Sequence, residues 1–357
     1  MSETLDKPKE IREGEELEAA AIEPFLKDSI PGLEGEVKVS QFPSGHSNLT
    51  YSISVGDADL VLRRPPFGTK AATAHDMHRE YKVLKALREA YPYCPEVLAY
   101  TDDESVIGCP FYVMRRIKGI ILRKELPKEL NFTPEKTRAF CEELIDVHAA
   151  LHNVDMYEVG LDTFGKPEGY TRRQVEGWSK RYRKAKTPDV PDCEAIMAWL
   201  AERMPPDPDK ATILHGDFKP DNVILDPNNP TKIIGVLDWE MATIGNPLMD
   251  LGSSLGYWTQ KGDPDEMRSA PMMPPELGEV MSRKEIIDRY AEKTGINMDN
   301  FNFYWCFGIF RLIVIAQQIY YRFYHKQTKD QRFAQLGLAV HILANAADRI
   351  VEGKLEI

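Results

Sequence analysis

A chain of 357 residues is longer than one ordinary hydrophobic core and favours two lobes or domains. Its hydrophobic content of 43% is that of a globular protein, and its net charge of -11 argues against nucleic-acid binding by general electrostatics. An anionic small molecule stays compatible with this charge, because a local basic pocket can lie on an acidic body. The 5 cysteines form no CxxC pair, and the charged N-terminal segment contains no apolar run typical of a secretory signal, so we expect reduced thiols and a cytoplasmic location.

The first third of the chain predicts a small β-rich lobe. Residues 1–18 are acidic and polar, and we expect them to be flexible. Residues 19–116 alternate between short apolar runs and turn residues, with a turn cluster at 42–48 and helical spacing of apolar residues at 75–90. This pattern indicates a meander, one inserted helix and a sheet of about five strands. The strands are expected at 37–41, 49–55, 60–63, 97–100 and 111–114.

Residues 117–357 predict a larger and mainly helical lobe. Thr133 is a suitable N-cap residue, and the apolar stripe after it has helical spacing. Short apolar runs broken by turns follow around 212–237, and helical spacing then returns. The most apolar stretch, Trp305–Tyr324, is interrupted by charged and amide residues, so it is expected to be a buried helix rather than a membrane span. The fold class is therefore α+β, with a small β-rich N-lobe and a large helical C-lobe.

Polar residues set between apolar runs mark a candidate site in the second lobe. Asp217 and Asn222 lie five residues apart across a loop that contains Pro220, and Asp238 follows a buried run sixteen residues after Asn222. Buried polar groups cost free energy unless they are bonded, so this bracketing favours a functional site over simple capping. The spacing can bring two carboxylates and a carboxamide oxygen together, and Mg²⁺ prefers such oxygen ligands.

Two motifs in this region resemble those of a known superfamily. HGDFKPDN at 215–222, followed by VLDWE at 236–240, resembles the aminoglycoside phosphotransferase and choline kinase-like superfamily, whose members are relatives of the protein kinases. The segments LVLRRPP at 60–66 and GNPLMDLG at 245–252 are most similar to the phosphotransferase-like domain associated with some acyl-CoA dehydrogenases. The resemblance implies a protein kinase-like two-lobed fold. It also implies Mg²⁺-dependent transfer of a phosphoryl group from ATP or GTP to a hydroxyl of a small molecule.

Roles carried over by this resemblance apply residue by residue. Asp217 resembles the catalytic-loop aspartate that orients the acceptor hydroxyl or accepts its proton. Asn222 and Asp238 resemble the two Mg²⁺ ligands that bridge the nucleotide phosphates. His215 and Asp250 resemble residues that support the catalytic loop, and ordinary structural hydrogen bonding is a compatible alternative for both.

The resemblance places the nucleotide on the small lobe. The turn after the first strand occupies the position of the phosphate-covering loop, whose backbone N–H groups could hold phosphate, although an ordinary hairpin turn is the alternative. Arg63 occupies the position where lysine is commonest, and Glu80 matches the acid that pairs with it. Arginine and lysine are not equivalent, which leaves open either a tuned nucleotide site or weakened catalysis. The implied nucleotide-binding residues are Ser44, Gly45, His46, Ser47, Asn48, Arg63 and Glu80, with Met114, Arg115 and Arg116 as a hinge facing the base.

The acceptor is the least defined part of the site. Arg311, Gln317 and Arg322 on the apolar helix could face the acceptor and hold an anionic group, with core and surface packing as the alternative. A hydroxylated acyl metabolite is slightly favoured over an aminoglycoside-like compound. We expect neither a nucleic-acid nor a membrane partner, and the sequence carries no signal for an oligomeric state.

Two other functions stay open. A nucleotide-binding regulatory module with little turnover is favoured slightly by Arg63, but the complete set of Asp217, Asn222 and Asp238 argues against it. A metal-dependent hydrolase that uses His215, Asp217 and Asp238 would need further ligands at short spacing. His148 and His152 lie four apart on a predicted helix and could share a metal, although a helix face with satisfied hydrogen bonds is the better interpretation.

Overall fold

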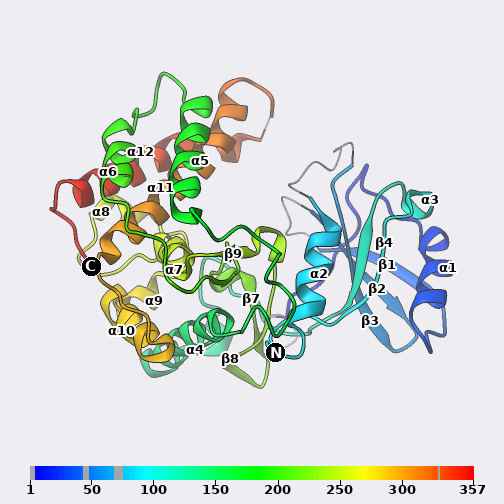
Figure 1. The fold of residues 1–357 in the computed structure, drawn as a ribbon. Helices are drawn as coiled ribbons and strands as arrows, with labels where there is room; N and C mark the ends of the chain where they lie inside the picture. Colours follow the sequence, from blue (N-terminus) through cyan, green and yellow to red (C-terminus); the bar gives the residue numbers. More distant parts are fainter. Residues whose placement is uncertain (1–4, 43–47, 68–74, 329) are drawn as a thin grey trace. The chain divides into compact units, whose positions relative to one another are not determined.

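The structure is a computed structural model that describes residues 5–42, 48–67, 75–328 and 330–357 (Figure 1). The chain divides into two compact units, residues 1–121 with 222–242 and residues 122–221 with 243–357. The sequence-based division at 116/117 places 222–242 in the C-lobe, whereas this segment belongs to the first unit. The reason is backbone pairing: Ile120 and Leu225 exchange N–H···O bonds of 3.0 and 2.8 Å, and the N–H of Val236 donates to the carbonyl of Tyr93 at 2.8 Å.

An antiparallel sheet of five strands forms the body of the first unit. Its strand order is β1-β2-β3-β5-β4, and α2 (Met77–Leu87) lies in the connection between β3 and β4 (Figure 1). The turn at Gly56–Asp57 joins β2 to β3 as a tight hairpin. The predicted meander, the five strands and the inserted helix are thus confirmed. The strands are β1 Val37–Gln41, β2 Leu49–Val55, β3 Ala58–Arg64, β4 Val97–Thr101 and β5 Phe111–Arg115.

The N-terminal segment and α1 (Ala19–Ser29) pack on this sheet. Residues 1–18 are expected to be flexible, yet residues 5–18 run beside the sheet. Lys9 exchanges backbone hydrogen bonds of 2.7 and 3.0 Å with Gln41 of β1, and Leu17 is buried in the same core cluster as Ile53. These bonds occupy the outer edge of β1, where N–H and C=O groups would otherwise stay unpaired.

A hairpin completes the first unit. β7 (Val223–Asp226) pairs with β8 (Asn229–Val236), and the short 3-10 turn η3 (Trp239–Met241) follows. Gly119 allows the close approach of the preceding segment, because a Cβ there would lie 2.5 Å from the carbonyl oxygen of Leu225. This hairpin separates Asn222 from Asp238 along the chain while keeping both in the first unit.

The second unit is mainly helical, and its central element is α11 (Phe301–Tyr324). α11 packs against α5, α7 and α12. It is long and apolar enough to cross a membrane by composition, but most of it is buried inside the unit, as in a core helix. A two-stranded ladder of β6 (Thr212–Leu214) and β9 (Thr243–Gly245) leads into the candidate site. The helices of eight or more residues are α4 Pro134–His152, α5 Tyr170–Ala185, α6 Glu194–Glu202, α7 Pro247–Gly256, α10 Arg283–Thr294, α11 and α12 Leu336–Val351.

Shorter elements connect these parts. In the first unit α3 spans Glu104–Ile107. In the second unit the connections contain η1 Lys128–Leu130, α8 Asp265–Ser269, α9 Pro275–Val280 and η4 Gln331–Gln335. The 3-10 turn η2 (Pro220–Asn222) lies where the chain passes from the second unit to the first.

Candidate active site

The loop after β6 carries Asp217 and is fixed through its backbone. The N–H groups of His215 and Gly216 donate to the two carboxylate oxygens of Asp250 at 2.8 and 2.9 Å. Gly216 has φ +84°, a left-handed conformation that favours glycine. The N–H of Asp217 donates to Nδ1 of His215 at 3.2 Å. Asp250 lies in the first turn of α7, where the helix dipole favours a negative charge. His215 and Asp250 therefore occupy positions from which they can support the loop.

Two histidines of α4 complete the shell around Asp250. Nε2 of His148 and Nε2 of His152 each lie 3.2 Å from Oδ2 of Asp250, and all three side chains are buried. Burial, followed by the neighbouring His152, lowers the pKa of His148 to about 4, so His148 is neutral near pH 7. Burial alone would raise the pKa of Asp250, but hydrogen bonds from His148 and His152 hold it well below its ordinary value. Asp250 is thus an anion that lies within hydrogen-bond distance of both imidazoles.

These three residues also form the one cluster of metal-ligand type found in the part of the chain that the structure describes. The carboxylate of Asp250 already receives two backbone N–H groups and two imidazole groups. His152 in addition contacts the hydroxyl of Tyr290 through Nδ1 at 2.5 Å, and His148 stacks on Phe218 at 4.1 Å between ring centroids. A hydrogen-bonded helix face accounts for this arrangement, in line with the interpretation favoured from the sequence.

The carboxylate of Asp217 is held by two side chains of the second unit. Nζ of Lys219 lies 2.9 Å from Oδ2, and the hydroxyl of Tyr257 donates to Oδ1 at 3.2 Å. The ammonium of Lys219 also lies 5.1 Å from the centroid of the Tyr257 ring. Burial would lower the pKa of Lys219, but Tyr257, Asp217 and Asp221 raise it, so the amine stays charged. Asp217 is therefore oriented from both oxygens.

In the first unit, Arg63 of β3 links two acids. Its Nε lies 3.2 Å from Glu80 on α2, and its Nη2 donates to Oδ1 of Asp238 at 3.1 Å. Burial would lower the pKa of Arg63, but Glu80, Tyr112 and Asp238 raise it well above its ordinary value. Burial raises the pKa of Glu80, and Arg63 opposes that shift. The guanidinium that replaces the commonest lysine therefore forms the predicted pair with Glu80 and reaches one predicted Mg²⁺ ligand as well.

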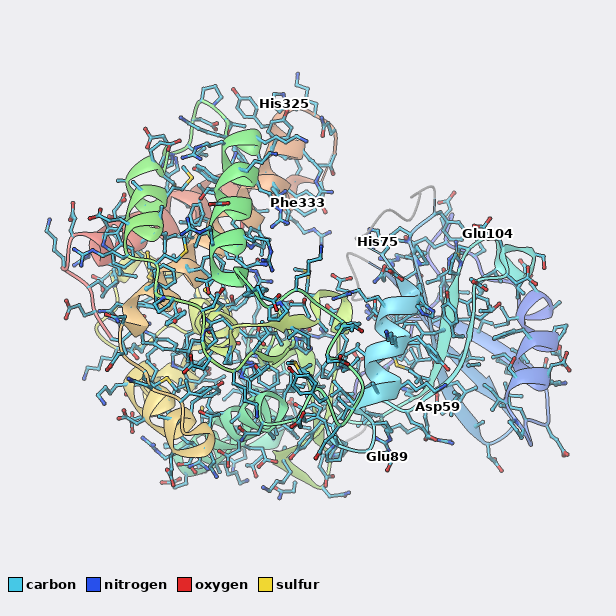
Figure 2. All side chains as sticks on the ribbon, viewed as in Figure 1. Asp59, His75, Glu89, Glu104, His325 and Phe333 are labelled. Atoms are coloured by element: carbon cyan, nitrogen blue, oxygen red, sulfur yellow. The ribbon has the colours of Figure 1, made fainter. Side chains whose placement is uncertain are left out.

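Asn48 extends this network. Its Nδ2 lies 3.0 Å from Glu80 and 3.0 Å from Glu240, and its Oδ1 lies 2.8 Å from Nδ1 of His75, which begins the described segment before α2 (Figure 2). The hydroxyl of Tyr112 donates to Glu80 at 2.9 Å. The other residues of the predicted phosphate-covering loop lie outside the described residues: Ser44, Gly45, His46 and Ser47.

Asn222 and Asp238 are brought together by the hairpin between them. The carbonyl of Asn222 accepts the N–H of Leu237, the residue before Asp238, at 2.8 Å. Asp238 has φ +67°, a conformation that non-glycine residues adopt rarely and that is enriched at functional sites. Its side chain is 34% exposed, so an ion can reach it. A carboxylate and a carboxamide oxygen are hard ligands that suit Mg²⁺, and these residues fit that ion.

The three residues predicted to form the hinge lie in different surroundings. The side chain of Arg115 pairs with Glu96 at 2.7 Å, and Arg116 pairs with Asp59 at 3.3 Å, while Met114 is buried in β5. Backbone contacts to a base therefore stay a prediction for these three residues.

On α11, Nε2 of Gln317 donates to the carbonyl of Ala185 at 2.8 Å and to Thr187 at 3.2 Å, which is a packing role. Arg322 is exposed and Arg311 is buried. Of the three predicted acceptor residues, Arg311 is thus the buried one that carries a charge, and its guanidinium carbon lies 5.4 Å from the ring centroid of Trp178 on α5.

Several residues of this site were not predicted from the sequence. Lys219 and Glu240 lie two positions from predicted residues, and their place inside the motifs could have indicated them. Tyr112 and Tyr257 carry no local signal, because their partners Glu80 and Asp217 lie 32 and 40 positions away.

Comparison with known proteins decides the family. Residues 38–270 match the model of the family described as "Phosphotransferase enzyme family". The chain belongs to this family. It is 35% identical over 330 residues to "Acyl-CoA dehydrogenase family member 10" of Mus musculus, a match that covers 92% of this chain and 30% of that relative. The chain thus spans less than half of the length of this curated relative.

Solved structures confirm a kinase-like α+β fold. A Ralstonia eutropha protein provisionally assigned as an aminoglycoside phosphotransferase aligns with a TM-score of 0.81 and 29% identity, over 96% of this chain and 100% of that one. Choline kinase of Cryptosporidium parvum aligns with a TM-score of 0.61 at 14% identity, covering 95% and 98% of the two chains. The GDP complex of an aminoglycoside 2'-phosphotransferase aligns with a TM-score of 0.59 at 15% identity, covering 93% and 99%. At these low identities the last two establish the fold alone.

Proposed function

We propose that the chain is an Mg²⁺- and nucleotide-dependent O-phosphotransferase that acts on a hydroxyl of a small molecule. The observation that carries the proposal is the oriented carboxylate of Asp217, held by Lys219 at 2.9 Å and Tyr257 at 3.2 Å on a loop braced by Asp250. A carboxylate fixed in this way can align an acceptor hydroxyl and accept its proton, and such positioning supplies much of the catalysis in phosphoryl transfer.

The other residues have complementary tasks in this proposal. Asn222 and Asp238 would hold Mg²⁺, which supplies positive charge against the phosphate oxygens. Arg63 stays charged and binds phosphate oxygens next to Asp238. The acceptor oxygen forms a bond to the terminal phosphorus, the bond from phosphorus to the bridging oxygen breaks, and the proton passes to Asp217. The nucleoside diphosphate leaves with the electron pair of the broken bond.

For the acceptor, we favour a hydroxylated acyl metabolite. The likeness to a relative named for acyl-CoA dehydrogenase supports this class, although the chain corresponds to only 30% of that relative. ATP and GTP are both compatible with the fold, since the structures that share it include a GDP complex.

The proposal is tested first by thermal shift with ATP, GTP or neither, each with and without Mg²⁺. A nucleotide at about a hundred times its dissociation constant stabilises a protein by about 2.7 kcal/mol, and for a chain of this size that corresponds to several degrees. A shift that requires Mg²⁺ supports the nucleotide site and names the base. No shift with either nucleotide would contradict the proposal.

Two variants then separate binding from transfer. Asp217→Asn should keep Mg²⁺-dependent nucleotide binding and lower transfer on the order of a hundred-fold or more. Asp238→Ala should abolish the Mg²⁺-dependent part of nucleotide binding. Asp265→Asn is the matched control, because it removes a carboxylate that is 97% exposed in the second unit. Nucleotide binding with no transfer to any acceptor, even in the unmodified protein, would indicate a regulatory module instead.

A further inference from the structure

Arg311 is a buried cation to which the protein itself gives no acceptor. Its relative exposure is 7%, and within the described part of the chain its guanidinium has no hydrogen bond or ion pair. The guanidinium carbon lies 5.4 Å from the ring centroid of Trp178 on α5. A buried charge without a compensating acceptor costs free energy, so a position of this kind needs an explanation.

Other buried arginines show what a structural arginine looks like in this chain. Arg283 donates to Asp263 and to the carbonyl of Trp258, and its guanidinium carbon lies 4.0 Å from the Trp305 ring centroid. Arg64 donates to a backbone carbonyl at 3.2 Å. Among the buried arginines of the described residues, Arg311 alone lacks such an acceptor. A packing role therefore does not account for its charge.

The guanidinium of Arg311 keeps contact with solvent. The described side-chain atoms that are fully enclosed and unpaired include Nε of Arg283, but they include no nitrogen of Arg311. The guanidinium of Arg311 thus retains some solvent exposure, although the residue as a whole is 7% exposed.

Two tyrosines connect Arg311 to the loop of Asp217. Burial raises the pKa of Tyr257 to about 12; the charge of Asp217 acts in the same direction, while Lys219 and Arg311 oppose it. Burial also raises the pKa of Tyr170; Asp250 adds to this shift and Arg311 opposes it. The geometry agrees with this placement, because α11 packs against α7 and a Cβ built on Gly256, the residue before Tyr257, would lie 3.2 Å from Cδ1 of Leu312, the residue after Arg311. Tyr257 bonds to Asp217, so α11 carries Arg311 past the end of the helix that orients the loop of Asp217.

We propose that Arg311 binds an anionic group of the acceptor, a carboxylate or a phosphate, while Asp217 orients the acceptor hydroxyl. This inference rests on the proposed phosphotransferase function and narrows its substrate class. A planar guanidinium suits bidentate contact with either anion, and stacking on Trp178 restricts its orientation. Lys219 does not serve this purpose, because its ammonium is engaged with Asp217. A polycationic, aminoglycoside-like acceptor is disfavoured by the same charges.

Binding of simple anions tests the site without any need for turnover. Acetate and inorganic phosphate are titrated against chloride at equal ionic strength, with Mg²⁺ and a non-hydrolysable analogue of the bound nucleotide present at saturation. The proteins compared are the unmodified chain, Arg311→Gln and Arg172→Gln, a control whose side chain is 70% exposed on α5. The dissociation constant should rise about ten- to a hundred-fold in Arg311→Gln alone, as expected for the loss of a charged hydrogen bond. Binding of acetate in preference to phosphate would identify the anionic group of the acceptor as a carboxylate, and the reverse preference would identify it as a phosphate.

Misfolding is separable from loss of the anion site. Removal of a buried charge that has no acceptor should leave the thermal midpoint of the free protein unchanged or raise it. Arg311→Lys keeps the charge and should retain part of the anion binding. Equal binding of both probes by all three proteins, or no anion binding by the unmodified chain, overturns the proposal.

Acceptor pairs provide the activity readout. 4-Hydroxybutyrate is compared with 1,4-butanediol, and glycerol 1-phosphate with glycerol. The charged member of one pair should be preferred by kcat/KM, and Arg311→Gln should remove this preference by raising KM while leaving the neutral member unchanged. Transfer without charge preference overturns the role of Arg311 and leaves the phosphotransferase function standing. If anion binding depends on Arg311 but no Mg²⁺-dependent nucleotide binding is found, the anion site at Arg311 stands and the phosphotransferase function is contradicted.

Discussion

The hydroxyl of Tyr257 donates a hydrogen bond to Oδ1 of Asp217 at 3.2 Å, across 40 positions of sequence. Tyr257 directly follows α7, the helix whose first turn supplies Asp250. Helix α7 therefore fixes the loop of Asp217 in two ways. Asp250 in its first turn accepts hydrogen bonds from the loop backbone, and Tyr257 just after its last turn donates to the carboxylate of Asp217. The carboxylate of Asp217 is therefore oriented by Tyr257 at the end of α7 as well as by Lys219 of its own loop.

Tyr257→Phe should lower kcat about ten-fold, because a hydrogen bond to a charged group contributes about 1.5–3 kcal/mol and here it orients the carboxylate. KM for the nucleotide should change little. Steady-state kinetics with the acceptor fixed at saturation measure both constants. The control is Tyr157→Phe, at a tyrosine that is 69% exposed. An unchanged kcat in Tyr257→Phe would assign Tyr257 a packing role only.

Arg63 and Glu80 should be strongly coupled in stability. Arg63→Met leaves Glu80 buried without its cation, and removal of one partner of a buried pair costs about 3–5 kcal/mol. The double variant Arg63→Met with Glu80→Gln should recover part of this loss. Urea unfolding of the unmodified chain, the two single variants and the double variant gives the coupling free energy between Arg63 and Glu80. Additive effects of the two changes would contradict the pairing seen at 3.2 Å.

Arg63→Lys is the matched conservative change for the same position. It keeps the charge next to Glu80 and Asp238 but removes the planar fork that reaches both. We expect a smaller loss of stability than in Arg63→Met, together with a changed KM for the nucleotide. Equal stability of the two variants would show that charge is not what Glu80 requires.

His148 should make the protein sensitive to acid between its unfolded and folded pKa values. The folded pKa of His148 is about 4, below the ordinary histidine value of about 6.5, so the unfolded chain binds a proton first as the pH falls. The free energy of unfolding should therefore decrease from about pH 6.5 towards pH 4, by about 3 kcal/mol for this group. The carboxylate of Asp250, whose pKa is held below its ordinary value, extends the loss to lower pH.

His148→Gln should flatten this pH dependence, even if it lowers stability at pH 7. Denaturant unfolding at several pH values measures the slope. The control is His325→Gln, at an exposed histidine in the second unit (Figure 2). A slope that is unchanged in His148→Gln would contradict a buried neutral imidazole at this position.

Gly308 should tolerate no side chain. A Cβ on Gly308 would lie 2.0 Å from the carbonyl oxygen of Gly252, where α11 meets α7, so Gly308→Ala must separate the two helices. Overpacking of this kind costs about 1–3 kcal/mol or more, and it should also lower kcat because α7 carries Asp250. Gly177→Ala is the matched control inside α5. A Cβ there would meet nothing within 4 Å, and alanine should stabilise the helix by about 1 kcal/mol.

The sequence by itself determined the elements whose signal is local. Period-two alternation and turn residues predicted the five-stranded sheet, and helical spacing predicted α2 and the buried α11, because burial of one face imposes that period on neighbouring residues. The spacing of Asp217, Asn222 and Asp238 indicated a site of oxygen ligands suited to Mg²⁺ for a similar reason, and the resemblance of the motifs at 215–222 and 236–240 added phosphoryl transfer as its implied function. Polar residues between buried runs are costly unless they act together.

Tertiary structure decided what depends on partners far along the chain. Only the fold shows that residues 5–18 lie along β1, that hairpin 222–242 belongs to the first unit, and that Tyr257 reaches Asp217. In sequence, Arg311 and Arg283 are two similar arginines. In the fold, Asp263 neutralises Arg283 while no described residue neutralises Arg311. The charge and burial of a side chain follow from every element packed around it, and a local pattern contains no information about those distant elements.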